Sequence, residues 1–345
     1  MAANVEARLM RVLVTGGAGY IGSRLIPALL ANGHDVTVYD ACVFGGDTLD
    51  AHPSLRMIIG DIRDVRRVRD AIRGQQAVIH LAFLSNDPGF RLSPALCEDV
   101  NLGGFKVVLD VALSCGVERF VLASSCSVYG ATERQGDEVD ERCEPNPLTD
   151  YAVHKVACER LLFDADRCGF YPIGVRAATV CGYARRQRLD LTFNRFATDG
   201  CVARRIVVRG GDRYRPFIAL ADLVTLYTRL LEIPAEAAAG RVFNAAYGNR
   251  TLADSAHAIA GHIGADVTVG MADDENHDAR SYRVSSRRVE ATLGFRPRLS
   301  LVDAAQEVTA AIARGWLVDP QSNPAYRNLI PQQRHDWSRG RFAHG

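Results

Sequence analysis

Several common features are missing from this sequence of 345 residues, and each absence excludes a class of protein. No apolar run reaches the roughly 18 residues that a membrane-spanning helix needs, so we expect no membrane partner. Residues 1–10 contain no apolar signal core, which favours a cytoplasmic location. The formal net charge is +1, so the overall charge does not predict binding to nucleic acid or to an anionic membrane.

Paired cysteines are also missing. The nine cysteines are scattered along the chain, without C-x-x-C pairs or clusters with histidine. This usage is typical of reduced thiols in the cytosol, and it predicts neither a disulfide framework nor a metal site. The composition that is present, 48% hydrophobic and 23% charged residues, is ordinary for a soluble enzyme of one large domain or two modest ones.

A glycine-rich turn is the most informative segment of the chain. Residues 12–22, VLVTGGAGYIG, predict a buried strand that runs into a tight turn and then into a helix. Gly17, Gly19 and Gly22 satisfy G-x-G-x-x-G, and Gly16 adds a second regular glycine spacing. Glycine suits such a turn because the backbone approaches a pyrophosphate, which the free N–H groups at the helix N-terminus bind. The segment therefore predicts a dinucleotide site.

Acidic residues follow the next two apolar runs. Asp40 comes 18 residues after Gly22, close to the roughly 20 expected of the acid that binds the adenosine ribose hydroxyls. A carboxylate there repels a 2′-phosphate, so NAD is favoured over NADP; the alternative is that Asp40 only caps a loop. Asp61 either lies beside the adenine or caps the helix that starts after Ile62.

Short apolar runs alternate with helical patterns along the first half of the chain. This alternation predicts an α/β fold, a Rossmann-type doubly wound parallel sheet with the glycine-rich turn at its carboxyl edge. The predicted strands are residues 12–15, 36–39, 57–59, 77–80, 119–123 and 173–176, with helices predicted over residues 23–31, 100–115 and 152–168.

The pattern changes after about residue 180. Arginine-rich loops and short strands follow, with helices predicted over residues 252–263 and 301–313 and capped by Thr251 and Ser300. From residue 320 the chain is rich in proline and polar residues, which predicts an irregular surface segment. We expect residues 1–180 to form a NAD-binding domain with the catalytic residues, 181–330 a smaller α/β lobe that mostly binds substrate, with some segments returning to the first domain, and 331–345 a tail.

Three residues suggest a catalytic centre. Tyr151 and Lys155 are spaced i and i+4, on one face of a predicted helix. The ammonium stabilises the phenolate and so lowers the tyrosine pKa from about 10 toward working pH, which makes Tyr151 a candidate general base for a sugar or alcohol hydroxyl. Ser125, just after a predicted strand, is a candidate to hold the same oxygen; the alternative is a serine that only satisfies loose backbone.

In their order and approximate spacing, these motifs resemble those of the extended short-chain dehydrogenase/reductases, the NAD-dependent epimerases and dehydratases that act on nucleotide sugars. The resemblance implies NAD as cofactor, a nucleotide sugar as substrate, and a homodimer formed through the helices near residues 100–115 and 152–168. The matching pieces are TGGAGYIG, Asp40, GDI at 60–62, HLA at 80–82, Asn101, SSCSVYG, YAVHK, RPFI at 215–218 and RSYRVSSRRVEATLGF at 280–295.

The resemblance also implies roles for matching positions. Tyr151 is then the acid/base, Ser125 its partner, and Lys155 also holds the nicotinamide ribose. The implied cofactor-binding residues are Gly16, Gly19, Tyr20, Ile21, Gly22, Asp40, Asp61, Ile62, Leu81, Ala82, Asn101, Tyr151 and Lys155. The implied substrate-binding residues are Ser125, Cys126, Thr179, Asn194, Arg215, Arg280 and Arg283, where Thr179 replaces an asparagine common in the family. Arg215 is chosen from an arginine-rich set that also contains Arg185, Arg186, Arg188, Arg204, Arg205, Arg209 and Arg213.

The residues after the serine bear on the reaction. Many 4,6-dehydratases of the family have Asp-Glu there, whereas this chain has Cys126 and Ser127. This difference favours 4-epimerisation through a transient 4-keto intermediate over dehydration. Cys126 leaves a 3,5-epimerase or epimerase-reductase open as an alternative, although a small buried residue is the favoured interpretation. A catalytically silent NAD-binding regulator is the alternative of another class, and the presence of Ser125, Tyr151 and Lys155 argues against it.

Overall fold

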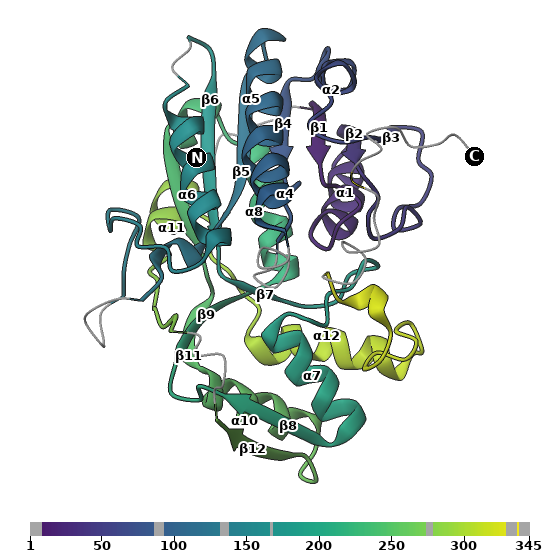
Figure 1. Cartoon of the computed structure of the whole chain (residues 1–345), viewed down its shortest axis with the longest axis vertical. Helices are drawn as coiled ribbons and strands as arrows, with labels where there is room; N and C mark the ends of the chain where they lie inside the picture. The colour runs from purple at the N-terminus through teal and green to yellow at the C-terminus, as the bar shows by residue number, and fades with distance from the viewer. Residues whose placement is uncertain are drawn as a thin grey trace, which may run out of the picture.

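A seven-stranded parallel sheet forms the centre of the structure, a computed structural model that describes residues 9–85, 93–131, 138–165, 168–273, 279–328 and 337. The strand order is β10-β6-β5-β4-β1-β2-β3, so the chain winds outward in both directions from β1 (Figure 1). This topology confirms the doubly wound prediction, and all six predicted strands are present. The strands are β1 (Arg11–Thr15), β2 (Asp35–Asp40), β3 (Leu55–Ile59), β4 (Ala77–His80), β5 (Arg119–Ser125), β6 (Tyr171–Ala177) and β10 (Arg241–Ala245).

Helices cover both faces of this sheet. Successive side chains of β1 point to opposite faces, so Val12 packs in one core with Leu25, while Leu13 packs in the other with Phe105. The first face carries α1 (Gly22–Ala31), α8 (Leu220–Glu232) and α11 (Arg287–Leu293), and the second carries α2 (Val65–Ile72), α5 (Gly104–Ser114) and α6 (Asp150–Phe163). The short helices α4 (Pro94–Glu98) and α9 (Ala235–Ala238) complete this part.

A smaller set of elements lies below the sheet in Figure 1 and has its own core around Phe193, Phe217 and Val308. It contains the sheets β11-β9-β7 and β12-β8 together with three helices. The strands are β7 (Thr179–Cys181), β8 (Arg205–Arg209), β9 (Tyr214–Ala219), β11 (Gly248–Thr251) and β12 (Thr268–Ala272), and the helices are α7 (Thr192–Ala203), α10 (Leu252–Ile263) and α12 (Leu301–Ala313). The boundaries proposed at residues 180 and 330 stay predictions.

The helix caps show how local sequence sets the ends of two of these helices. Thr251 accepts a hydrogen bond from the Asp254 N–H, and Ser300 forms a capping box with Asp303, so both predicted caps are confirmed. The predicted capping role of Asp61 is wrong. Asp64 caps α2 instead, because its side chain accepts the N–H groups of the first turn.

Three further predictions about the chain were only partly met. The segment predicted as a helix over residues 100–115 begins with a π-helical turn, Asp99–Gly103, before α5. The next predicted helix ends at Phe163, as α6, five residues earlier than expected. Most of the predicted irregular tail lies outside the described residues, and its described part forms one 3₁₀ turn, Pro324–Tyr326. In the portion of the chain that the structure describes, no helix is both long and apolar enough to cross a bilayer.

Candidate active site

The glycine-rich turn packs directly against the end of β4. Gly16 has φ +72°, and a Cβ there would lie 2.5 Å from the Ala82 nitrogen, so no side chain fits. Its N–H donates to the Tyr39 carbonyl at 2.9 Å, which holds the turn against the end of β2. A side chain at Gly22 would likewise collide with the Gly17 backbone. The turn therefore brings bare backbone to the first turn of α1, a cradle that fits a dinucleotide diphosphate.

Asp40 joins this turn to the loop after β2. Its carboxylate accepts hydrogen bonds from the Ala18 N–H at 3.0 Å and the Cys42 N–H at 2.7 Å. Burial raises the pKa of Asp40, and these two donors oppose that rise by stabilising the charged form. Asp40 therefore caps the loop after β2 and ties it to the glycine-rich turn, and its ribose-binding role stays a prediction.

Asp61 and Ile62, which are also predicted to bind the cofactor, lie just after the end of β3. The Asp61 carboxylate forms an ion pair with Arg63 at 2.6 Å, and Arg63 also reaches Asp99. Ile62 packs against Gly104, because a Cβ at that glycine would lie 2.6 Å from the Ile62 side chain. The segment Asp61–Ile62 is thereby anchored to the start of α5.

Tyr151 and Lys155 lie one turn apart at the start of α6, near the end of β5 where Ser125 stands. Lys155 is buried, its Nζ donates to the Ala123 carbonyl at 2.6 Å, and it lies 5.7 Å from the centre of the Tyr151 ring. Burial lowers the pKa of Lys155 to about 8. The Ser125 Oγ accepts the Ser127 N–H at 3.2 Å, which positions the hydroxyl at the head of the next turn. The structure thus gathers the three predicted catalytic residues at one edge of the sheet.

Phe83 covers this pair and was not singled out from the sequence. Its ring centre lies 3.5 Å from the Lys155 Nζ, and it meets the Tyr151 ring edge to face with centres 5.5 Å apart. The ring gives the buried ammonium a cation–π contact. The only sequence signal for it is the large aromatic residue directly after HLA, at the carboxyl end of β4.

Next to the candidate catalytic residues lies a buried polar network that no sequence pattern indicated. Glu159, one turn beyond Lys155, accepts two hydrogen bonds from Arg176, at 3.0 and 2.7 Å, and a further one from the Ser124 hydroxyl. Arg176 continues to the Tyr129 hydroxyl at 2.8 Å. The network joins α6, β5 and β6 to the turn that follows Ser125.

Two asparagines predicted to contact ligands are fully buried. Asn194 donates to the Tyr20 hydroxyl at 3.0 Å and accepts the Gly182 N–H at 3.0 Å. Asn101 accepts the Leu84 N–H at 2.8 Å and so supports the strand-end segment that contains Leu81 and Ala82. Both amide groups make their hydrogen bonds within the protein, so neither faces a ligand in this conformation. The predicted substrate contact of Asn194 is corrected to a tie between the glycine-rich turn and the smaller lobe, and direct cofactor contact by Asn101 is corrected to support of its neighbours.

Cys126 is likewise buried, with its Sγ 3.0 Å from the Arg176 carbonyl. Burial raises the pKa of this thiol, so the thiolate that a ring-proton base requires is disfavoured. The structure therefore agrees with the small buried residue and corrects the predicted substrate contact at this position.

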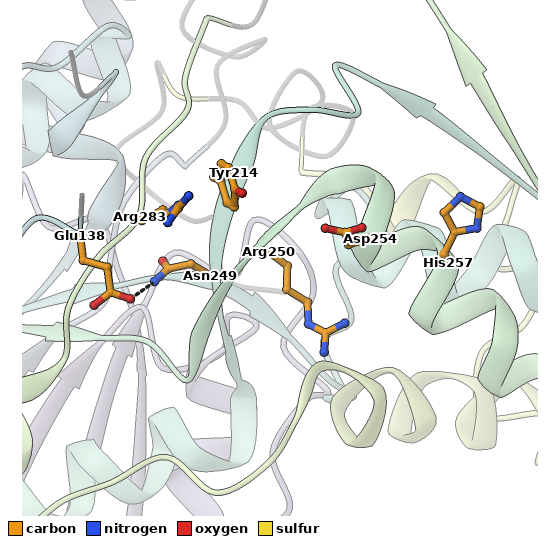
Figure 2. Close-up of a pocket in the computed structure, with 7 residues that line it drawn as sticks. All are labelled: Glu138, Tyr214, Asn249, Arg250, Asp254, His257 and Arg283. Atoms are coloured by element: carbon orange, nitrogen blue, oxygen red, sulfur yellow. Dashed lines mark hydrogen bonds between the residues drawn. The ribbon is translucent and has the colours of Figure 1, made fainter. Parts of the chain in front are cut away.

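The arginines predicted for the substrate come from β9 and from residues 280–283. Arg215 donates to the carbonyl of Arg280, so these two residues are in contact. Arg283 lies over the ring of Tyr214, 4.1 Å from its centre, and both line a cavity of about 560 Å³ (Figure 2). The other lining residues are Glu138, Asn249, Arg250, Asp254 and His257. Thr179 opens β7 and pairs with Phe217.

The doubly wound sheet, the glycine cradle and the Ser-Tyr-Lys group define a dinucleotide-dependent enzyme of the Rossmann class. A sequence model of the NAD dependent epimerase/dehydratase family matches residues 12–246. The chain belongs to this family, and its cofactor is NAD. Curated relatives that act on nucleotide sugars confirm the family that the motifs resembled.

Individual relatives carry several activities. The chain is 33% identical to a dTDP-glucose 4,6-dehydratase of Streptomyces griseus over 341 residues, covering 91% of this chain and 99% of the relative. It is 27% identical to a UDP-glucose 4-epimerase of Lactobacillus helveticus, covering 85% and 94% of the two chains. Protein y4nG of Sinorhizobium fredii is 36% identical over 183 residues, which cover 53% of this chain and 44% of y4nG. DesIV of Streptomyces venezuelae, a dTDP-glucose 4,6-dehydratase solved with NAD, superposes with TM-score 0.79 at 27% identity, over 90% of this chain and 99% of DesIV.

Proposed function

We propose that this protein is an NAD-dependent nucleotide-sugar 4-epimerase. The observation that carries the proposal is the turn after β5, Cys126–Tyr129, which has no carboxylate, combined with Ser125, Tyr151 and Lys155 at one edge of the sheet. A 4-epimerase needs one acid/base at the sugar C4 oxygen. A 4,6-dehydratase needs further groups to remove the C5 proton and expel the C6 hydroxyl.

Tyr151 acts in this proposal as the general base at the C4 hydroxyl, with Ser125 holding the same oxygen. The Lys155 Nζ lies 5.7 Å from the centre of the Tyr151 ring, and as an ammonium it would stabilise the phenolate. NAD, when bound, would supply a reversible hydride acceptor for the sugar C4. Tyr151 would return the proton to the C4 oxygen after the 4-keto sugar has turned its opposite face toward the hydride donor, so the net reaction would be inversion at one carbon.

We assign the cofactor to the residues predicted for it around α1, β2 and β4. The glycine-rich turn, including the backbone of Tyr20 and Ile21, would hold the diphosphate, and Asp40 the adenosine ribose. Leu81 and Ala82 lie against Gly16 and would line the path toward the catalytic residues. Asp61 and Ile62 would lie by the adenine, and Lys155 would bind the nicotinamide ribose.

The substrate assignment rests on arginine chemistry. Arg215, Arg280 and Arg283 would bind the nucleotide diphosphate, because a guanidinium forms paired hydrogen bonds to phosphate oxygens. Thr179 would contact the sugar. The base and the sugar are left unassigned. The homodimer through α5 and α6 stays a prediction, which light scattering of the purified protein tests. The cytoplasmic location also stays a prediction.

Dehydration is the second candidate, because the Streptomyces griseus dehydratase is 33% identical over nearly the whole chain. Proton NMR of the protein with UDP-, dTDP-, GDP- and CDP-sugars in D2O, with added NAD, separates the two reactions. A 4-epimer without ring deuterium supports the epimerase. Loss of the C6 hydroxyl with deuterium at C5 contradicts it and establishes a dehydratase, and exchange at C3 and C5 establishes a 3,5-epimerase. Tight NAD binding with no turnover of any sugar contradicts the epimerase and supports the silent regulator.

A further inference from the structure

The loop between β7 and α7 lies against the start of α1. The Gly182 carbonyl accepts the Tyr20 hydroxyl at 2.7 Å, and the Arg186 N–H donates to the Ser23 Oγ at 3.3 Å. Arg24, the next residue of α1, donates to the Tyr183 carbonyl at 2.8 Å. The loop is therefore fastened to the glycine-rich turn and first helical turn, where the diphosphate of a dinucleotide binds.

Arg186, within this loop, is a buried arginine with incomplete hydrogen bonding. Its side chain donates to the Gln187 carbonyl at 3.1 Å and to the Asn328 Oδ1 at 2.6 Å, and its guanidinium lies 3.9 Å from the centre of the Phe44 ring. The residue is only 4% exposed, and its Nε has no hydrogen-bond acceptor among the described residues. One of its donors is thus buried without a partner, which is unfavourable unless a ligand supplies the acceptor.

The charge of Arg186 is also incompletely compensated. Within the described ranges no carboxylate forms an ion pair with it, since the nearby Asp190 pairs with Arg188 at 3.0 Å. Burial, together with the positive charge of Arg188, lowers the pKa of Arg186 to about 9, against the opposing charges of Asp190 and Asp40. A buried cation is strongly unfavourable without a counter-ion, so this position calls for an anion.

We propose that Arg186 is a binding residue for the diphosphate of NAD, which supplies the missing acceptor and counter-charge. NAD is the anion that this family brings to the start of α1, and the backbone N–H of Arg186 is held there by Ser23. The negative charge of Asp40, the predicted ribose-binding residue, also acts on the Arg186 guanidinium. Its planar fork suits paired contacts to phosphate oxygens. A loop from the second half of the chain would thereby help to retain the cofactor.

A purely structural role makes different predictions. If Arg186 only anchors Phe44 and Asn328, its loss lowers the stability of the nucleotide-free protein and weakens all ligands alike. If it binds the diphosphate, its loss weakens only ligands that carry one. Removing an uncompensated buried cation then leaves the nucleotide-free protein as stable as before or more stable.

The experiment compares Arg186→Met and Arg186→Lys with the control Arg185→Met, whose exposed arginine pairs with Asp50. Calorimetric titration of nucleotide-free protein with NAD, ADP-ribose and adenosine is combined with the melting temperature with and without NAD. We expect Arg186→Met to bind NAD and ADP-ribose ~10–100-fold more weakly and adenosine within about twofold of the wild type. Arg186→Lys should retain part of the affinity for NAD and ADP-ribose, and Arg185→Met should bind both as the wild type does.

The melting temperature of nucleotide-free Arg186→Met is expected to be unchanged or higher, with a reduced rise on adding NAD. Unchanged NAD affinity, an equal loss for adenosine, or a lower melting temperature with the full NAD-induced rise each overturns the proposal. No sugar is involved, so the result stands apart from whether the protein is a 4-epimerase.

Discussion

Glu159 and Arg176 form an ion pair in the interior, with Oε2 and NH2 2.7 Å apart and side chains only 7% and 6% exposed. Glu159 lies on α6 one turn beyond Lys155, and Arg176 lies on β6, so the pair fixes α6 to the sheet. The carboxylate also accepts the hydroxyl of Ser124, the neighbour of Ser125. One buried carboxylate thus sets the relative position of the Ser125 strand and the Tyr151–Lys155 helix.

Glu159→Gln is expected to destabilise the protein by ~3–5 kcal/mol, because it leaves the Arg176 guanidinium buried without a counter-charge. Urea unfolding measures the loss as a lower midpoint with an unchanged slope. Asp50→Asn is the matched control, since it removes the partner of exposed Arg185 and should leave the midpoint in place. Equal midpoints for Glu159→Gln and the wild type would contradict this role.

Gly16→Ala tests the close approach of the glycine-rich turn to β4. Gly74 has a similar φ, +79°, but open space around the position of a Cβ, whereas a Cβ at Gly16 meets the Ala82 backbone. Gly74→Ala should therefore cost only the ~1–2 kcal/mol of a left-handed residue, and Gly16→Ala clearly more. Thermal unfolding of both variants measures their loss of stability. Equal losses would show that the backbone of the turn shifts to accommodate the added methyl group.

The buried ammonium of Lys155 makes stability depend on pH. Its pKa is about 8 in the folded protein, below the 10.5 of a free lysine. Between these values the unfolded chain holds a proton that the folded chain has released, so folding stability rises with pH across this window. Below pH 8 the buried charge disfavours the folded state in full.

Lys155→Met removes this dependence. The stability of this variant relative to the wild type should fall by ~2 kcal/mol between pH 7 and pH 10, as the wild type sheds its buried charge. Denaturant unfolding at several pH values measures the difference. A stability difference that stays constant across the window would mean that Lys155 keeps its ordinary pKa in the folded protein.

Tyr151→Phe removes the proposed general base while keeping the ring that meets Phe83. Turnover of the nucleotide sugar should fall by ~10²–10⁴-fold or more, because proton transfer from the sugar hydroxyl loses its acceptor. NAD affinity should stay within a factor of a few, which titration with NAD checks. Normal turnover by this variant would contradict the mechanism, and lost NAD binding would show that the change disturbed the cofactor site.

Patterns set by near neighbours were predicted well from the sequence. The glycine-rich turn, the six strands of the first half, and the capped helices α10 and α12 follow from periodicity and from residues within a few positions. Where a second nearby acid competed, local reasoning was insufficient. Asp61 and Asp64 both precede α2, and only Asp64 lies where its side chain can accept the first-turn N–H groups.

Roles that depend on distant partners were not predictable from the same patterns. Asn194 looked suited to a ligand, but it meets Tyr20, from a strand-turn-helix unit 174 residues away in sequence. Arg186 was one of many arginines in the second half, and its burial against Phe44 and Asn328 sets it apart.

Patterns within single strands, turns and helices predicted the glycine-rich turn and the candidates Ser125, Tyr151 and Lys155, and the resemblance of the motifs as a set implied the family and NAD. Three features follow only from the packing of the folded chain: Phe83 covers Lys155, Glu159 joins α6 to the sheet, and Cys126 is buried. The physical reason is that burial and long-range contacts set the pKa, the accessibility and the partners of a side chain, and these arise only when segments far apart in the chain pack together.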